Sequence, residues 1–376
     1  MKNGVDLFHQ KCHFQRVMKS PDTMKDLENH AAEALRALLQ QVPTIKLGRI
    51  KIEPDGPDHG IDILAQIQVA GCPHTLVCEV KASGQPRHVR TAILQLRNYL
   101  AHLKDEATPI LIAPYLSPEA QALCREQQVA FLDLEGNARL VFNGVFIERL
   151  VASKPKPEQR ELRSLFRPKS AQVLRALLRD PNRAWRVNEL AQAAGVSLGH
   201  VSNVRTALLN REWARLSGDG ISLSKPDALI DAWSKAYEPP KGKRLAFYTT
   251  LHGSAFEETA RRVFPSEQQN GHAVFASFSA AHWLAPYART STHYFYADSH
   301  GLKAVQEALK LSSAAKGENV VVIVLLDPGL FLDTVEPARG VFCTSPVQTY
   351  LDLTVAGERG REAADHLRAA RLTWPK

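Results

Sequence analysis

Apolar and polar residues follow two different rhythms in the first part of the chain. From Asp26 to Val42 apolar residues recur at intervals of three and four, which predicts an amphipathic helix. The short apolar runs Gly60–Val69 and Thr75–Val80 predict strands, and Arg87–Lys104, opened by Pro86, predicts a second helix. More strands and another helix follow in the same interleaved order. This alternation predicts a layered α/β fold around a central sheet.

Two segments rich in proline and charge interrupt these patterns. They are Ser153–Ser170 and Tyr237–Arg244. We therefore expect an α/β multidomain chain of three parts. These are an α/β/α domain at 1–152, a basic linker with a helical domain at 153–240, and an α/β or α+β domain at 241–376.

Composition changes this picture mainly through charge. The 376 residues are 44% hydrophobic, which is enough for real cores, and carry a formal net charge of +8. This basic balance favours an anionic partner, with nucleic acid preferred to a membrane surface. There is no apolar stretch of about eighteen residues and no secretory signal pattern. Five cysteines without a Cys-x-x-Cys pair fit a reducing cytoplasm.

The positive charge is concentrated in one segment. Between Ser153 and Arg215 there are thirteen lysines and arginines against five acidic residues. The difference of eight equals the excess of the whole chain. We therefore expect a polyanion to bind first at this central segment.

Charged residues also interrupt one predicted strand, where they require an explanation. A turn centred between Ala70 and Gly71 would place Asp62 directly opposite Glu79, and strand alternation would put Lys81 on the same face. Opposed residues on one face have Cβ atoms roughly 5 Å apart. Two carboxylates and an amine are thus predicted to converge.

Such a group suits hydrolysis of a phosphodiester. The carboxylates of Asp62 and Glu79 offer the oxygen ligands that Mg²⁺, or Mn²⁺, prefers, and Lys81 could orient a water or balance negative charge. The plain alternative for Glu-x-Lys alone is an exposed edge strand with a surface ion pair.

The spacing of these residues resembles a known nuclease family. The string GID at Gly60–Asp62, seventeen positions before EVK, resembles the PD-(D/E)XK nucleases, which have the restriction-endonuclease-like fold. The string QLRNY resembles the Gln-x-x-x-Tyr pattern of their RecB-type members. The resemblance implies that Asp62 and Glu79 bind metal and that Lys81 is catalytic. It implies positioning roles for Gln95 and Tyr99. A fold that is kept without its chemistry remains the alternative.

Three other acids in this part are further candidates for the site. Some members of that family add an acid from the first helix, for which Glu33 is the candidate. Asp133 and Glu135 alternate with apolar residues just before a Gly136-Asn137 sequence typical of a hairpin turn. They could face the site, but a solvated strand face is the preferred interpretation.

The segment Val187–Trp213 resembles a helix-turn-helix. Ala191 would let two helices approach closely, Gly195 would take the left-handed turn conformation, and Val201 would pack between the helices. Ser197 is a suitable N-cap for the second helix. The alternative is an ordinary helical hairpin that joins two domains.

The second helix of this pair would present its outer face to DNA. Asn can read adenine and Arg guanine in the major groove. The following Ala214–Pro226 segment predicts two short strands around a glycine turn, the wing of a winged helix. Trp185, Trp213 and Trp233 are expected in the core. The predicted DNA contacts are Ser197, His200, Ser202, Asn203 and Arg205, with Leu198 and Gly199 on the same face.

The C-terminal part again mixes strands and helices. A His-Gly-Ser string at His252 could suggest a nucleotidyltransferase, but the paired aspartates are missing. The strings FSAAHWLAPY (278–287) and SPVQTYLDL (345–353) resemble AbiEi-type proteins, antitoxins and transcriptional repressors of type IV toxin–antitoxin systems that carry a winged helix before this domain. The N-terminal domain departs from the simplest AbiEi layout. Helix caps or surface polarity would explain Asp352 and His366.

Two functions follow from these observations. The first is a Mg²⁺-dependent DNA nuclease targeted by its own winged helix. The second is a non-catalytic regulator or antitoxin of the AbiEi type. The expected partner is double-stranded DNA; a second copy of the chain and a nucleotidyltransferase-like toxin encoded nearby are further candidates.

Overall fold

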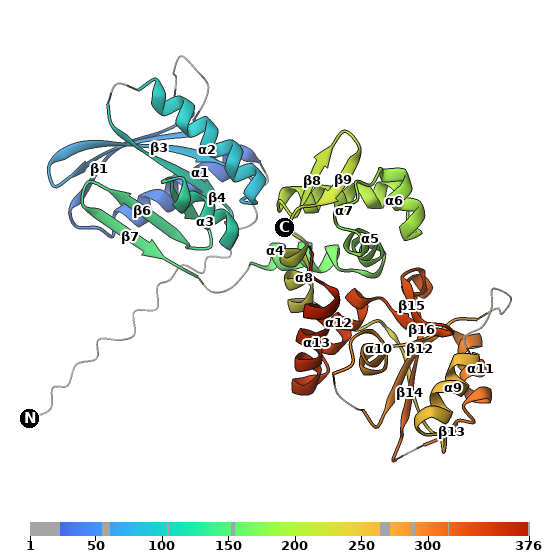
Figure 1. Cartoon of the computed structure of the whole chain (residues 1–376). Coiled ribbons are helices and arrows are strands. Elements are labelled where there is room, and N and C mark those ends of the chain that lie inside the picture. The colour runs from blue at the N-terminus through green and yellow to red at the C-terminus, as the bar shows by residue number, and fades with distance from the viewer. Residues whose placement is uncertain are drawn as a thin grey trace, which may run out of the picture. The chain divides into compact units, whose positions relative to one another are not determined.

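The computed structural model describes residues 23–54, 61–103, 105–151, 155–263, 271–287, 290–314 and 316–374. The chain forms two compact units, Met1–Pro155 and Lys156–Lys376, each with its own core (Figure 1). The expected boundary at 152/153 falls close to the division between the units, and the expected boundary at 240/241 lies within the second unit. The Gly60 of the nuclease-like string lies outside the described residues.

The first unit is a seven-stranded mixed sheet with three helices, in the order β1-β2-β3-β4-β5-β6-β7. The central strands β3, β4 and β5 run parallel and the flanking pairs are antiparallel. The elements are α1 (Met24–Leu39), β1 (Ile45–Ile52), β2 (Ile63–Val69), β3 (Cys72–Val80), α2 (Pro86–Ala101), β4 (Ala107–Ala113), α3 (Pro118–Glu126), β5 (Ala130–Asp133), β6 (Ala138–Phe142) and β7 (Val145–Arg149).

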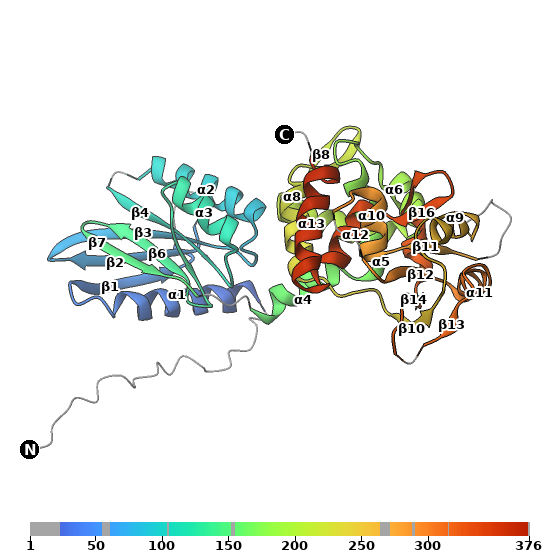
Figure 2. The same ribbon diagram turned by 60° about the horizontal axis from the view of Figure 1, so that its bottom comes forward.

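The helices cover both faces of this sheet. Figure 2 shows α1 along one face and α2 with α3 along the other. Leu76, Cys78 and Val80 of β3 belong to the core beneath α1, whereas Val77 belongs to the core beneath α2 and α3. The strand is buried on both faces, because parallel strands need a helix layer on each side. The mixed α/β fold is therefore confirmed.

The turn between β2 and β3 fixes their register. Ala70 and Gly71 have φ angles of 48° and 90°, the left-handed values of a two-residue hairpin turn. Val69 pairs with Cys72, and the ladder continues without a shift to Ile63 and Cys78. This register is the one predicted from the sequence.

Asp133 is buried, not solvated, and this corrects the preferred sequence interpretation. It is 1% exposed at the end of β5. Its carboxylate accepts hydrogen bonds from the backbone N–H groups of Leu116, Glu135 and Asn137 and from the Asn137 side chain, at 2.8–3.1 Å. It therefore holds the β5–β6 turn, where Gly136 has φ 104° as predicted, while Glu135 is exposed.

The second unit begins with helices and a two-stranded sheet and continues into a second seven-stranded sheet, ordered β13-β10-β14-β12-β11-β16-β15. Its first elements are α4 (Lys156–Leu165), α5 (Pro168–Arg179), α6 (Val187–Ala194), α7 (Leu198–Asn210), β8 (Ala214–Ser217), β9 (Gly220–Leu223) and α8 (Pro226–Lys235). The remaining elements are β10 (Gly242–Tyr248), α9 (Gly253–Val263), β11 (Ala273–Phe275), α10 (Ser277–Leu284), β12 (His293–Ala297), α11 (Ser299–Ala308), β13 (Ser312–Ser313), β14 (Val320–Leu325), the 3₁₀ helix η1 (Pro328–Leu332), β15 (Thr334–Ala338), β16 (Val341–Thr344), α12 (Pro346–Thr354) and α13 (Gly357–Arg371).

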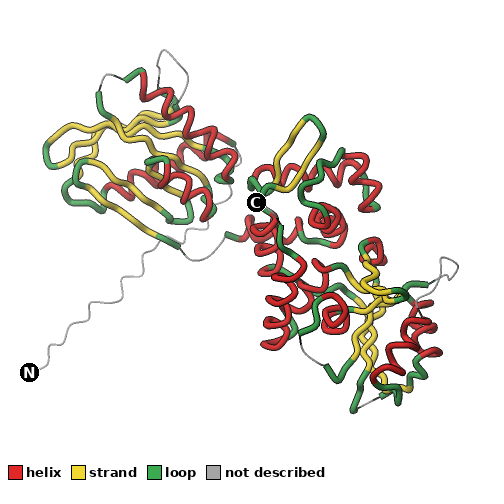
Figure 3. Tube along the Cα trace, in the orientation of Figure 1, coloured by secondary structure: helices red, strands yellow, loops and turns green. Residues whose placement is uncertain are grey.

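Helices flank the second sheet as well (Figure 3). In Figure 1 the helices α9 and α11 lie on one side of it, and α10, α12 and α13 on the other. The helical segment shares one apolar core with this sheet. Trp185, Trp213 and Trp233 are all buried in that core, as expected. The buried Arg175 of α5 donates a hydrogen bond to Gln348 of α12 at 3.1 Å.

The α6–α7 pair has the local features predicted for it. Gly195 ends α6 with φ 60°, and the hydroxyl of Ser197 accepts a hydrogen bond from the His200 N–H at the start of α7. Ala191 and Val201 are buried. These residues set the tight turn between the two helices. Within the described ranges, no helix has the length and apolar character needed to cross a membrane.

Candidate functional site

The structure brings Asp62 and Glu79 together at the end of the β2–β3 hairpin. The Asp62 N–H donates to the Cys78 carbonyl at 3.1 Å, which continues the hairpin register, and its Oδ2 accepts a hydrogen bond from the Val80 N–H at 2.6 Å. Glu79 lies on β3 and is only 3% exposed. Asp62 is half-buried beside it, and its negative charge adds to the effect of burial in raising the pKa of Glu79.

Lys81 completes the predicted group. Its Nζ donates to Glu79 Oε1 at 2.6 Å, and its side chain is partly exposed. Its backbone N–H donates to the Ile112 carbonyl of β4 at 2.9 Å, so β3 continues its pairing past the strand end. The exposed edge-strand alternative is wrong, because β3 lies inside the sheet between β2 and β4.

A third carboxylate comes from α1, but from a different residue than expected. Glu33 is exposed, whereas Glu28 is 5% exposed and its pKa is raised by burial and by the charges of Asp62 and Glu53. The sequence carried a signal for it: Glu28 lies on the apolar stripe of the helix, one turn before Ala31 and Ala32. A charge on a buried helix face is unusual unless it has a use.

The electrostatics of the site are unfavourable to its own anions. Burial raises the pKa of Glu79 to about 7; the hydrogen bond from Lys81 opposes this, and the charges of Asp62 and Glu28 add to it. Burial also raises the pKa of Asp62, against the lowering effect of the Val80 N–H. One lysine does not balance three carboxylates.

The donor set fits a divalent cation. The Oε2 atoms of Glu79 and Glu28 are buried and have no hydrogen-bond partner. A cation would satisfy such oxygens and lower the raised pKa values. Within the described residues no three His, Cys, Asp or Glu side chains form a ready cage. The protein would thus supply few ligands, which suits Mg²⁺ because that ion keeps several waters.

Gln95 and Tyr99 lie further along α2. Gln95 is exposed, and Tyr99 is half-buried against the core beneath α2. The helix approaches the site with its first turn instead. The half-buried His88 lies in that turn. Burial lowers the pKa of His88, and the positive charges of Arg87 and Lys81 lower it further, so His88 lies close to Lys81. Gln95 follows His88 by seven residues, roughly 10 Å along the helix axis.

The second region of interest is the exposed face of α7. Ser197, Ser202 and Asn203 are exposed, as predicted. His200 is half-buried, and its Nε2 lies 3.1 Å from the hydroxyl of Ser170 on α5. The sequence placed His200 on the outer face among the DNA contacts. The structure corrects this, because the side chain packs against α5.

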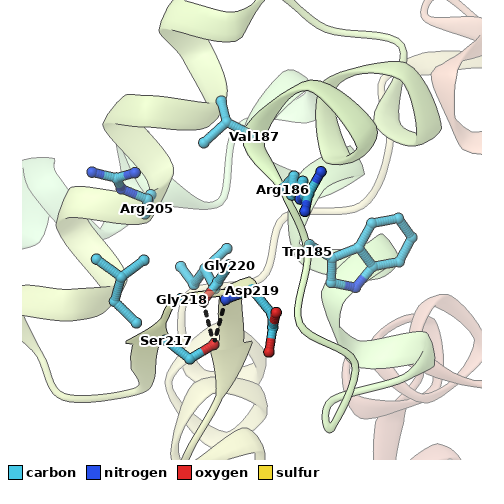
Figure 4. A pocket seen from close by; sticks show the side chains of 10 residues that line it. Trp185, Arg186, Val187, Arg205, Ser217, Gly218, Asp219 and Gly220 are labelled. Atoms are coloured by element: carbon cyan, nitrogen blue, oxygen red, sulfur yellow. Dashed lines mark hydrogen bonds between the residues drawn. The ribbon is translucent and has the colours of Figure 1, made fainter.

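A pocket of about 380 Å³ lies between α7 and the β8–β9 hairpin. Arg205 lines it from α7, and residues 185–187 and 216–221 line it from the opposite sides (Figure 4). Arg205 is half-buried, and its Nε has no hydrogen-bond partner. The hairpin tip is held by Ser217, whose hydroxyl accepts from the Asp219 N–H and donates to the Gly220 carbonyl, both at 3.3 Å.

Part of the positive charge of this region is neutralised within the unit. Arg175 lies 3.8 Å from Asp333, and Arg179 also pairs with Asp333. Arg211 pairs with Glu158 at 3.0 Å. Glu158 is already among the five acids of the counted segment, but Asp333 lies outside it. The local excess of eight charges therefore overstates what a polyanion meets.

Asp352 proves to be a core residue. It is buried in α12 and accepts hydrogen bonds from Tyr296 at 3.0 Å, from Gln348 at 2.9 Å and from Tyr237. Burial raises its pKa to about 6. The expected explanation by a helix cap or surface polarity is wrong for Asp352. His366 is exposed, as expected, and its ring lies 5.2 Å from that of Tyr287.

Several solved structures are similar to part of the chain. The apo structure of EndoMS has 19% identity and a TM-score of 0.21 over 28% of this chain and 45% of that one. A repair endonuclease from Pyrococcus abyssi has 18% identity and a TM-score of 0.21 over 27% and 46%. A complex of EndoMS with double-stranded DNA has 20% identity and a TM-score of 0.22 over 29% and 46%. The match spans under half of those chains, so the case for a nuclease depends on the site geometry.

No curated protein matches the chain. A family match covers the C-terminal part, beginning at β9 and ending after α13. It includes both strings that resembled AbiEi proteins. Residues 222–373 match the family described as "Transcriptional regulator, AbiEi antitoxin, Type IV TA system", as the C-terminal motif predicts.

Proposed function

We propose that this protein is a DNA-binding, metal-dependent phosphodiesterase whose active site is formed by Asp62, Glu79 and Lys81. The observation that carries the proposal is the buried Glu79, whose Oε2 is unpartnered while its Oε1 is bound by Lys81. Burial, together with the charges of Asp62 and Glu28, raises the pKa of Glu79 to about 7. Perturbed, buried acids of this kind cluster at functional sites.

In this proposal Asp62 and Glu79 would hold Mg²⁺ or Mn²⁺. The bound ion would supply charge stabilisation at the attacked phosphate and a water of lowered pKa. Asp62 is kept in place by the Val80 N–H, so its carboxylate has one fixed orientation. The partly exposed Nζ of Lys81 is near enough to solvent to contact a phosphate oxygen or orient a water. Glu28 adds negative charge that strengthens cation binding.

The second unit would bring the site to double-stranded DNA. We propose that α5 to β9 act as a winged helix, with α7 in the major groove and the β8–β9 hairpin against the backbone. The exposed Ser202 and Asn203 support base contacts. The half-buried Arg205, at the pocket between the helix and the hairpin, is placed for a base or a phosphate.

Incubation of supercoiled and linear DNA with the full chain tests the catalytic proposal. Cleavage is expected with Mg²⁺ or Mn²⁺ and is expected to stop with EDTA. Glu79→Gln and Lys81→Met should abolish it, while Glu33→Gln, a change of an exposed acid on α1, should leave it intact. Cleavage by the Glu79→Gln protein at the wild-type rate would refute the assignment.

A second candidate function has its own support. Because residues 222–373 match the AbiEi family, the chain could instead be an operator-binding regulator or antitoxin, with a nucleotidyltransferase-like toxin encoded nearby and a homodimer on a symmetric site. Salt-sensitive binding to an inverted repeat without any cleavage would favour this function. Both functions place the protein in the cytoplasm.

A further inference from the structure

One large apolar side chain of α7 faces away from the core. Leu198 is 57% exposed in the first turn, whereas Val201, Val204 and Leu208 are buried against the neighbouring helices. Leu198 and Ser202 are four residues apart and so share one face of the helix, which continues to Arg205. The exposed Leu198 is thus the first side chain on the face of α7 that we propose to contact DNA.

The surroundings of Leu198 leave it accessible and its position well defined. Gly199, the next residue, has open space where a Cβ would lie, so no neighbouring side chain packs against that position. Ser197 caps the helix, and His200 is turned inward to Ser170. Leu198 is therefore the projecting side chain of a fixed helix end.

The major groove offers one apolar group that matches such a side chain. Thymine carries a C5 methyl group there, and the other three bases do not. Leucine donates and accepts no hydrogen bonds, so it discriminates bases by burying that methyl group. Single exposed leucines are common on protein surfaces. Leu326, 78% exposed before η1, is one in the same unit and provides a matched control.

We propose that Leu198 is a specificity-determining residue that contacts the C5 methyl group of thymine in the bound DNA site. This inference rests on the proposed DNA binding by α7. Ser202 and Asn203 then contact polar base edges on the same face, and Leu198 adds a preference for thymine at the position nearest the start of the helix.

The test removes the methyl group from the DNA. Duplexes that bind the full chain are first enriched from a random-sequence pool in EDTA, so that no duplex is cut. In the enriched duplex each thymine is then replaced in turn by deoxyuridine, which lacks only that methyl group. We expect roughly three- to fivefold weaker binding at one or two positions, the effect of one buried methyl group.

The variants assign the effect to the side chain. Leu198→Ala should bind the thymine duplex three- to fivefold more weakly and should no longer respond to deoxyuridine at those positions. Leu198→Met should keep the response, and Leu326→Ala should behave as wild type. The inference is wrong if Leu198→Ala loses affinity at the same deoxyuridine positions as the wild type, or if the wild type loses affinity at none of them. Either result leaves the proposed DNA binding by α7 untouched. If no sequence is enriched, DNA recognition by α7 fails with the inference.

Discussion

Replacing Glu79 by Gln tests the electrostatics of the nuclease-like site without any assay of cleavage. The folded pKa of about 7 lies above the ordinary value of 4.5, so the folded protein binds this proton more tightly than the unfolded chain does. The protonated Glu79 therefore contributes to the free energy of unfolding, fully below about pH 4.5, and this contribution is lost as the pH rises through 7. The difference of roughly 2.5 pK units corresponds to about 3 kcal/mol. Glutamine keeps the shape and removes the charge.

We therefore expect Glu79→Gln to stabilise the first unit at pH 8.5 by up to about 3 kcal/mol and to leave it nearly unchanged at pH 4.5. Urea unfolding followed by two signals isolates that unit. All five tryptophans, at positions 185, 213, 233, 283 and 374, belong to the second unit, so tryptophan fluorescence reports that unit alone. Far-UV circular dichroism reports both. Glu33→Gln, at an exposed acid, is the control.

Addition of Mg²⁺ at pH 8.5 completes the experiment. The wild-type first unit should gain stability, because the ion binds the folded site and not the unfolded chain. The Glu79→Gln protein should gain little. If the variant and the wild type show the same dependence on pH and on Mg²⁺, then Glu79 does not carry an uncompensated charge, and the physical basis of the site is refuted.

Three further changes test the fold around the sites. Asp133→Ala should destabilise the first unit by about 2–4 kcal/mol in urea unfolding, because four donors, three of them buried, lose their acceptor. Gly195→Ala should lower the unfolding midpoint of the second unit by tryptophan fluorescence, at a cost of about 1–2 kcal/mol, since φ is 60° and the new Cβ would lie 2.9 Å from Leu332. Burial lowers the pKa of His74 below 6.5, so the first unit should lose stability as the pH falls through 6.5, and His74→Gln should lose less in the same urea unfolding experiment.

Local turn chemistry made the hairpin of the candidate site predictable. Ala70 and Gly71 between two apolar runs left one register in which both strands bury their apolar faces, and a slip of one residue would have exposed them. The register then placed Asp62 opposite Glu79. The same reasoning predicted the turn at Gly195, because a left-handed residue is needed where two helices meet at a short connection.

Tertiary packing decided what the sequence left open. The apolar stripe of α1 was visible in the sequence. The rotation of the helix about its axis, which the packing on the sheet decides, buries Glu28 and leaves Glu33 exposed to solvent. His200 was assigned to the outer face of its helix, yet α5 lies close enough for Ser170 to bind it. The count of basic residues ignored Asp333, which lies about 150 positions away in sequence and neutralises part of them. Long-range partners of this kind leave no local pattern.

The buried acids of the first unit are costly features for a domain that only supports a fold. Glu79 and Glu28 each leave an oxygen buried without a partner, and burial and the charges of Asp62 and Glu28 raise the pKa of Glu79. An apolar residue of similar size at position 79 would remove that penalty. Asp133 in the same sheet is a structural carboxylate, and its oxygens accept four hydrogen bonds. The contrast between a satisfied acid and two unsatisfied ones within one domain supports the proposal that the unsatisfied pair binds a cation supplied from solution.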